Sequence, residues 1–234
     1  MYKRVLLKLS GEALSSKSST FDSEILNSLA NEIKRVVHSG VQVAIVVGGG
    51  NVIRGKFANE MNIPRVEADK MGMLGTVINA LALRAALERN GQKAYVQSAI
   101  EMNRICDLVN YERAIEKLEE NVVVIYGGGT TNPYFSTDSA AALRACEINC
   151  QAILMGKNGT DGVYDKDPNK YNDAVKFKEM TYHDILEKKL KIMDATAAGL
   201  LDDNDIDTVV FNINEFKNIT KVLENPSIGT VIRG

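Results

Sequence analysis

Short apolar runs alternate along the chain with segments in which apolar residues recur every three or four positions. The runs have the length of strands, and the periodic segments have the length of helices. Strands that alternate with helices form parallel sheets, and the helices cover both faces of the sheet. We therefore predict an α/β fold, a three-layer α/β/α sandwich with a largely parallel central sheet, in which residues 1–234 form a single domain.

The apolar runs place the predicted strands at residues 5–9, 41–47, 94–97, 122–126, 152–155 and 208–211. A first helix is expected to begin after Asp22, a residue type suited to capping, and to end at Gly40. The longest helix is expected over residues 67–90. Further helices are expected to begin near Asn110, Asp138, Thr181 and Glu215.

Composition excludes several classes of protein. The net charge of −2 and the charged fraction of 25% show no basic surplus for binding nucleic acid. No signal peptide is recognised at the start, and no apolar window approaches the roughly 20 residues of a membrane span. We therefore expect a cytoplasmic protein without nucleic-acid or membrane partners. The cysteines lack metal-ligand spacing and should be buried, whereas both histidines should lie at the surface.

Four predicted strand ends carry turn-forming residues, at 9–11, 48–50, 127–129 and 156–159. Glycine lets backbone N–H groups approach an anion closely, and a helix that follows adds partial positive charge. Ligands of open α/β sheets bind at the carboxyl ends of the strands. The four turns together therefore predict a phosphate site, although four unrelated tight turns would give the same pattern.

Two familiar nucleotide motifs are incomplete in this chain. Residues 50–57 approach a P-loop, but Phe57 stands where Ser or Thr would bind Mg²⁺. A dinucleotide fingerprint would need a third glycine where Ile53 follows the turn at residues 48–50. We therefore expect neither a P-loop enzyme nor a dinucleotide-binding dehydrogenase.

Charged residues lie close to these turns. Lys8 belongs to an otherwise apolar strand, so it either points to solvent or meets an anion, because burying an unpaired ammonium is costly. Arg54 follows the second glycine turn and either binds phosphate or stays solvated. Asp138 either caps a helix or organises the reacting groups beside the third turn.

Two further acidic segments each allow two interpretations. Asp69 lies near the start of the longest helix, where it suits either the helix dipole or the two hydroxyls of a ribose. Residues 161–168 contain Asp-Gly and Asp-Pro pairs, which favour a hairpin. The same segment could also wrap a nucleotide, with Tyr164 against adenine and Asp167 on a hydroxyl.

Taken together, these segments resemble those of the bacterial uridylate kinases, a group within the amino acid kinase family. The resemblance rests on KLSGEA at 8–13, GGGNVIRG at 48–55, ADKMGML at 68–74, NPYFSTDSAAALR at 132–144, DGVYDKDP at 161–168 and MDAT at 193–196. These sequences occur in the family's order and cover essentially the whole chain. The segments that contain Asp69 and Asp138 are the more specific ones.

The resemblance implies transfer of the γ-phosphoryl group of ATP to UMP, with Mg²⁺ arriving on ATP and no metal site formed by the protein alone. It implies Lys8 and Asp138 as the catalytic pair, in which Lys8 stabilises charge and Asp138 orients either Lys8 or the metal. The ATP-binding residues that it implies are Lys8, Leu9, Ser10, Gly11, Gly50, Arg54, Asn158, Tyr164 and Asp167. The UMP-binding residues that it implies are Gly49, Asp69, Thr130, Thr131, Asn132, Pro133, Tyr134, Phe135, Ser136 and Thr137.

The resemblance also implies a homohexamer of the pyrimidine biosynthesis pathway, an allosteric enzyme activated by GTP and inhibited by UTP. The chain departs from the family at two positions. Thr131 stands where the family usually has glycine, and its Cβ limits how closely that backbone approaches UMP. Asn158 stands where many members have threonine, so a threonine's contact is not transferred to it unchanged.

Two alternative functions stay open on the sequence alone. A kinase of the same family could act on carbamate or an amino-acid carboxylate, but such kinases lack the combination of Asp69 with residues 132–138. A non-catalytic nucleotide sensor could use the same fold. The presence of Lys8, Arg54 and Asp138 argues against a sensor, because a sensor does not need groups that promote transfer.

Overall fold

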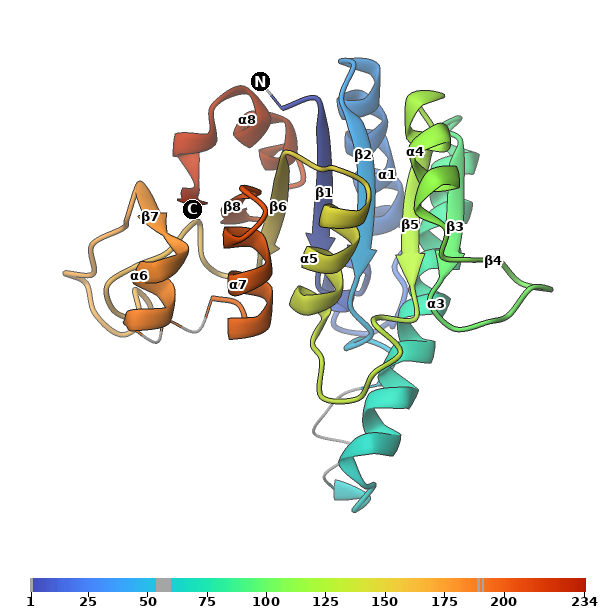
Figure 1. Ribbon diagram of the computed structural model, residues 1–234, viewed down its shortest axis with the longest axis horizontal. Helices are drawn as coiled ribbons and strands as arrows, with labels where there is room; N and C mark the ends of the chain where they lie inside the picture. The colour runs from blue at the N-terminus through green and yellow to red at the C-terminus, as the bar shows by residue number, and fades with distance from the viewer. Residues whose placement is uncertain (1, 54–59, 189, 191) are drawn as a thin grey trace.

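A computed structural model describes residues 2–53, 60–188, 190 and 192–234. Within these residues, strands form one nine-stranded sheet in the order β4-β3-β5-β2-β1-β6-β8-β9-β7 (Figure 1). Neighbouring strands are parallel except β8 and β9, which are antiparallel. The strands are β1 Arg4–Leu9, β2 Gln42–Val47, β3 Ala94–Ser98, β4 Asp107–Leu108, β5 Val123–Gly127, β6 Ala152–Lys157, β7 Glu179–Thr181, β8 Asp207–Asn212 and β9 Thr230–Arg233.

Helices cover both faces of the sheet. The α-helices are α1 Ser23–His38, α3 Arg65–Arg89, α4 Tyr111–Glu119, α5 Thr137–Glu147, α6 Tyr182–Glu187, α7 Ala195–Asp202 and α8 Asn218–Glu224. Short 3₁₀ helices occupy Gly11–Leu14 and Pro226–Ile228. Helices α1, α3 and α8 pack on one face, and α4, α5, α6 and α7 pack on the other. The predicted three-layer α/β/α sandwich with a largely parallel sheet is confirmed.

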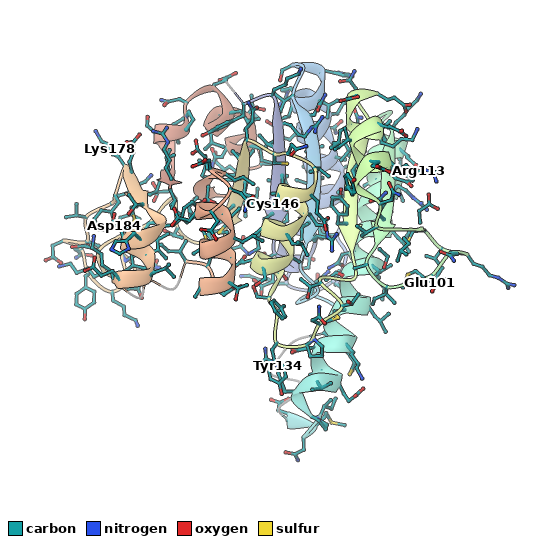
Figure 2. All side chains as sticks on the ribbon, viewed as in Figure 1. Glu101, Arg113, Tyr134, Cys146, Lys178 and Asp184 are labelled. Carbon is teal, nitrogen blue, oxygen red and sulfur yellow. The ribbon has the colours of Figure 1, made fainter. Side chains whose placement is uncertain are left out.

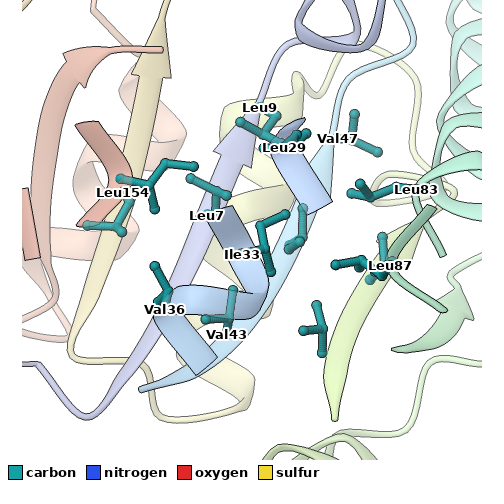
Figure 3. Packing of buried hydrophobic residues seen from close by; sticks show 14 of the residues in the cluster. Leu7, Leu9, Leu29, Ile33, Val36, Val43, Val47, Leu83, Leu87 and Leu154 are labelled. Carbon is teal, nitrogen blue, oxygen red and sulfur yellow. The ribbon is translucent and has the colours of Figure 1, made fainter. Parts of the chain in front are cut away.

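The alternation of side chains along the strands creates two hydrophobic cores. In β1, Leu7 and Leu9 face α1, and Leu6 faces the opposite layer. Figure 3 shows Leu7 and Leu9 beside Leu29 and Ile33 of α1, and these four side chains are at most 1% exposed. Each such side chain contributes about 1.5–3 kcal/mol on burial. The apolar strands therefore hold their carboxyl ends, and the turns that follow, at one edge of the sheet.

Several predicted boundaries are confirmed and others need correction. Asp22, Asn110 and Thr181 each cap the helix that was expected to follow. The longest helix begins at Arg65, and α8 begins at Asn218, three residues after Glu215. Strands β4, β7 and β9 were not predicted, because they are only two to four residues long. Helix α7 was not predicted either, because it is an alanine-rich segment without a clear apolar stripe.

Helix α3 extends beyond the sheet at the edge where the parallel strands end (Figure 1). By length and composition alone, this helix is long and apolar enough to cross a membrane. The expectation that no apolar segment approaches the length of a membrane span is therefore corrected. Half of the most apolar window of α3 is buried inside the protein, and the core helix of a globular protein can be equally long and apolar. Its packing against β3 and β5 is that of a core helix.

Candidate active site

The four glycine turns meet at one edge of the sheet because β5, β2, β1 and β6 are adjacent and parallel. A cavity of about 530 Å³ opens at this edge, between α3 and the N-terminus of α5. The predicted ligand-binding residues that line it are Gly49, Gly50, Asp69, Thr130, Phe135, Ser136 and Thr137. The cavity is large enough for a small molecule of nucleotide size.

Lys8 and Asp138 form a buried ion pair at the end of β1. Lys8 Nζ lies 2.7 Å from Asp138 Oδ1, and the two side chains are only 11% and 16% exposed. The interpretation of Lys8 as an outward-facing lysine is therefore wrong. Asp138 is not a cap either, because Ser136 caps α5 and accepts hydrogen bonds from the N–H groups of Asp138 and Ser139 at 2.9 and 3.3 Å.

The first and second glycine turns pack directly against each other. A Cβ on Gly11 would lie 2.2 Å from Asn51 Oδ1 and 2.7 Å from the Gly48 carbonyl oxygen, so only glycine fits there. The side-chain amides of Asn51 and Asn79 bond each other at 3.1 and 2.7 Å, and Asn79 Nδ2 also donates to the Gly48 carbonyl at 2.6 Å. This pair was not predicted from the sequence, although a polar residue such as Asn79 within the apolar stretch of α3 indicates a buried hydrogen-bond partner.

Helix α3 also holds the third glycine turn in place. Thr76 Oγ1 accepts a hydrogen bond from the Gly128 N–H at 2.8 Å and donates to the Met73 carbonyl at 2.6 Å. A Cβ on Gly49 would lie 2.4 Å from the Gly72 carbonyl oxygen, so the second turn reaches α3 at van der Waals distance. The long helix therefore sets the relative positions of two turns that face the cavity.

Asp69 connects α3 to the predicted acceptor loop. Its Oδ2 accepts a hydrogen bond from the Tyr134 N–H at 2.7 Å, and both carboxylate oxygens lie 2.8 Å from Arg65 Nε. The Arg65 guanidinium lies 5.3 Å from the centre of the Tyr134 ring. Tyr134 lies beside the protruding half of α3 (Figure 2). Thr131, Asn132, Pro133 and Tyr134 belong to this loop but do not line the cavity.

Thr131 adopts a left-handed backbone with φ of 65°, at the position where the resembled kinases have glycine. A side chain in that region costs about 1–2 kcal/mol, whereas a new glycine costs about 0.5–1 kcal/mol through the unfolded chain. We expect Thr131→Gly to leave the free energy of unfolding unchanged or raise it by up to about 1 kcal/mol in urea denaturation. Thr130→Gly, where φ is not positive, should lower it. If Thr131→Gly lowered the free energy of unfolding by more than about 1 kcal/mol, the backbone at Thr131 would not be strained.

Among the described residues, the other predicted ATP-binding residues do not line the cavity. Asn158 Nδ2 lies 3.5 Å from Ser10 Oγ, so the fourth turn borders the first. Leu9 is buried in the core. Arg54 falls in residues 54–59, outside the described residues.

Residues 161–168 begin a hairpin, as one of the two interpretations predicted. Tyr164 forms an antiparallel bridge with Lys176, and its hydroxyl donates to Asp161 Oδ1 at 2.7 Å, which raises the pKa of Tyr164 to about 12. The Asn169 N–H donates to Asp167 and lowers the pKa of that carboxyl group. Nucleotide binding by Tyr164 and Asp167 stays a prediction.

A network around Asp194 fixes the N-terminus of α5 and was missed by the sequence analysis. Asp194 caps α7, and its carboxylate accepts hydrogen bonds from Ser139 Oγ at 2.9 Å and from Ser136 Oγ. Burial raises the pKa of Asp194, but the hydrogen bonds from Ser136, Ala197 and Ser139 outweigh it and lower the pKa overall. The ion-paired Asp138 therefore lies on a helix terminus that is tied to α7.

Both histidines and two of the three cysteines take the environments that the sequence predicted. Cys106 and Cys150 are buried and Cys146 is half-buried, all three as free thiols, and burial raises the pKa of each. His38 and His183 are exposed. Among the described residues, no group of three or more His, Cys, Asp or Glu side chains is placed to hold a metal ion.

The family model described as "Amino acid kinase family" matches residues 3–212, almost the whole length of the chain. The chain belongs to the amino acid kinase family. A family member named "Uridylate kinase" from Limosilactobacillus reuteri (strain DSM 20016) is 53% identical over 100% of this chain and 98% of its own length. A "Uridylate kinase" from Oenococcus oeni (strain ATCC BAA-331 / PSU-1) is 52% identical over 100% of this chain and 97% of its own length.

Solved structures in the amino acid kinase family agree with the fold. The crystal structure of UMP kinase from Bacillus anthracis has a TM-score of 0.96 and 38% identity, and the match covers 99% of this chain and 96% of that one. The crystal structure of UMP kinase from Ureaplasma parvum has a TM-score of 0.94 and 40% identity, with 100% of both chains covered.

Proposed function

We propose that this chain, as a single domain, transfers the γ-phosphoryl group of ATP to UMP and produces ADP and UDP. The observation that carries the proposal is the buried pair of Lys8 and Asp138 at the strand ends, among four glycine turns. The names of the relatives, which match over the full length of the chain, support UMP as the acceptor.

In this proposal an oxygen of the UMP phosphate attacks the γ-phosphorus of ATP. A bond forms between that oxygen and the γ-phosphorus, and the bond to the bridging oxygen breaks as ADP leaves. The Lys8 ammonium stabilises the charge that develops on the phosphoryl group, and Asp138 fixes the position of Lys8. No general base is needed because the UMP phosphate is already ionised at neutral pH. Mg²⁺ enters on the ATP phosphates as part of the substrate.

The proposed donor site consists of the first and fourth turns, with Lys8, Ser10 and Gly11 near the ATP phosphates and Asn158 beside the adenosine. The proposed acceptor site is the cavity beside α3, where Gly49, Asp69, Thr130 and residues 135–137 line the space for UMP and residues 131–134 complete the acceptor loop. Two features support this division. The cavity lies on the α3 side of the second turn, and Asp69 presents a carboxylate to it, which suits the hydroxyls of a ribose.

An ADP-release assay with ATP and Mg²⁺ tests the proposed function. UMP, CMP, dUMP and glutamate are offered as separate acceptors, and we expect turnover mainly with UMP. Turnover with glutamate would overturn the acceptor and keep the family's reaction type. ATP binding without ADP release for any acceptor would favour the nucleotide sensor over the kinase.

The resemblance to uridylate kinases also leads us to propose a cytoplasmic homohexamer in pyrimidine nucleotide synthesis, activated by GTP and inhibited by UTP. An apolar surface on α3 supports self-association, because Leu74 and Ile78 are 49% and 46% exposed and lie one turn apart. Light scattering should give the mass of six chains. A monomer at micromolar concentration would contradict the assembly, and kinetics unchanged by GTP and UTP would contradict the regulation.

A further inference from the structure

Lys157, the last residue of β6, lies next to the catalytic pair but has no part in the mechanism above. Strand β6 is the neighbour of β1, and Lys8 is in register with Met155. Because side chains alternate along a strand, Lys157 projects on the same face as Met155 and Lys8, two residues closer to the edge. Two lysines therefore share one face at the ends of adjacent strands.

The end of β6 also borders the predicted phosphate-binding turn. Asn158, the next residue after Lys157, places its Nδ2 3.5 Å from Ser10 Oγ and 3.4 Å from Glu12 Oε2. Lys157 thus lies close to the Lys8–Asp138 pair, and the residue that follows it borders the first glycine turn. The first turn follows β1 directly, as expected of a loop that binds the phosphates of a nucleotide.

The charges around Lys157 leave room for an anion. Its ammonium is half-buried and donates a hydrogen bond to the Ile192 carbonyl at 2.6 Å. No carboxylate of the described residues forms an ion pair with it. Burial lowers the pKa of Lys157 and the Lys8 charge lowers it further, whereas Asp138 raises it. Two ammonium groups and one carboxylate thus share a partly desolvated site, which a phosphate would neutralise.

We propose that Lys157 is a second phosphate-binding cation, which contacts the β- and γ-phosphates of the nucleotide donor. The inference rests on the proposed function, because it takes ATP as the donor. The Ile192 carbonyl holds the ammonium in position before the nucleotide arrives. Residue 192 directly precedes the MDAT segment, whose Asp194 ties down the N-terminus of α5. One short segment of chain thus supports both Lys157 and the helix that carries Asp138.

Calorimetric titration of Lys157→Met with a non-hydrolysable ATP analogue, ADP, AMP and UMP tests the proposal. We expect the dissociation constant of the ATP analogue to rise by about 10- to 100-fold, as loss of a charge-assisted hydrogen bond predicts. The effect should be smaller for ADP, and absent for AMP and UMP, which offer no β- or γ-phosphate. Lys157→Arg, which keeps the positive charge, should recover part of the lost affinity.

Lys34→Met is the matched control, because Lys34 is also half-buried and donates to a backbone carbonyl, that of Asn90 at 2.9 Å. Lys34 lies on α1, away from the glycine turns, so its substitution should leave all four affinities unchanged. If Lys157→Met fails to fold, Lys157→Gln replaces it, since glutamine removes the charge and keeps an N–H donor.

An equal loss of affinity for ATP analogue, ADP and AMP would overturn the proposal and reduce Lys157 to a structural anchor of residue 192. An unchanged affinity for the ATP analogue would also overturn it. Failure of the proposed function is separate from either outcome. It would appear as absent ADP release with UMP in the unmodified chain, and the phosphate-dependent pattern of binding would still be measured.

Discussion

Replacing Lys8 with methionine should lower kcat by about a thousandfold or more, the scale seen when a group that stabilises transition-state charge is removed. Methionine has nearly the same length as lysine but carries no charge. The substitution therefore removes the interaction with the phosphoryl group and leaves the volume at the end of β1 almost unchanged. Steady-state rates of UMP-dependent ADP release measure the effect, with ATP and UMP both saturating.

A second consequence of Lys8→Met follows from its partner. The change leaves Asp138 unpaired and mostly buried, since its side chain is only 16% exposed. Breaking a buried ion pair on one side costs about 3–5 kcal/mol of stability. The assay is therefore run well below the melting temperature of the variant, and circular dichroism verifies that it is folded. A folded Lys8→Met variant with near-normal kcat would remove Lys8 from the mechanism.

The architecture was predictable because the signals that specify it are local and repeated. Leu6, Leu7 and Leu9 belong to an apolar run of strand length, and Leu29 and Ile33 repeat at the spacing of a helix. Elements without such a pattern were missed. Strand β9 owes its place to pairing with β8 rather than to its four residues, and this is a long-range property that a local window does not contain.

The candidate site was predictable where chemistry and position coincide along the chain. Lys8 stands out as a charge in an apolar strand, and the parallel sheet then brings its end close to the start of α5. The pairing of Asn51 with Asn79 and the hold of Asp194 on Ser139 were not predictable, because each joins residues far apart in sequence. Such side-chain networks depend on packing between elements, for which one sequence offers no local sign.

Asp138→Asn should also lower kcat strongly, by about a hundredfold or more, the scale of a single preorganised electrostatic contact. Asparagine keeps the shape of the side chain and loses the charge that holds Lys8 in place. The KM for UMP should change little, because Asp138 contacts Lys8 and does not line the acceptor cavity. Steady-state kinetics with UMP and ATP varied separately distinguish the two effects.

Combining Lys8→Met with Asp138→Asn separates catalysis from stability. Each single variant leaves one buried charge without its partner, whereas the double variant leaves none, so it should regain most of the lost free energy of unfolding. Its kcat should stay as low as that of Lys8→Met, because the stabilising cation is still absent. Urea denaturation and ADP-release rates on all four proteins complete the cycle. The double variant could instead lose as much free energy of unfolding as the two single variants lose together. In that case the two charges would not be coupled, and the pair would not be the unit that organises transfer.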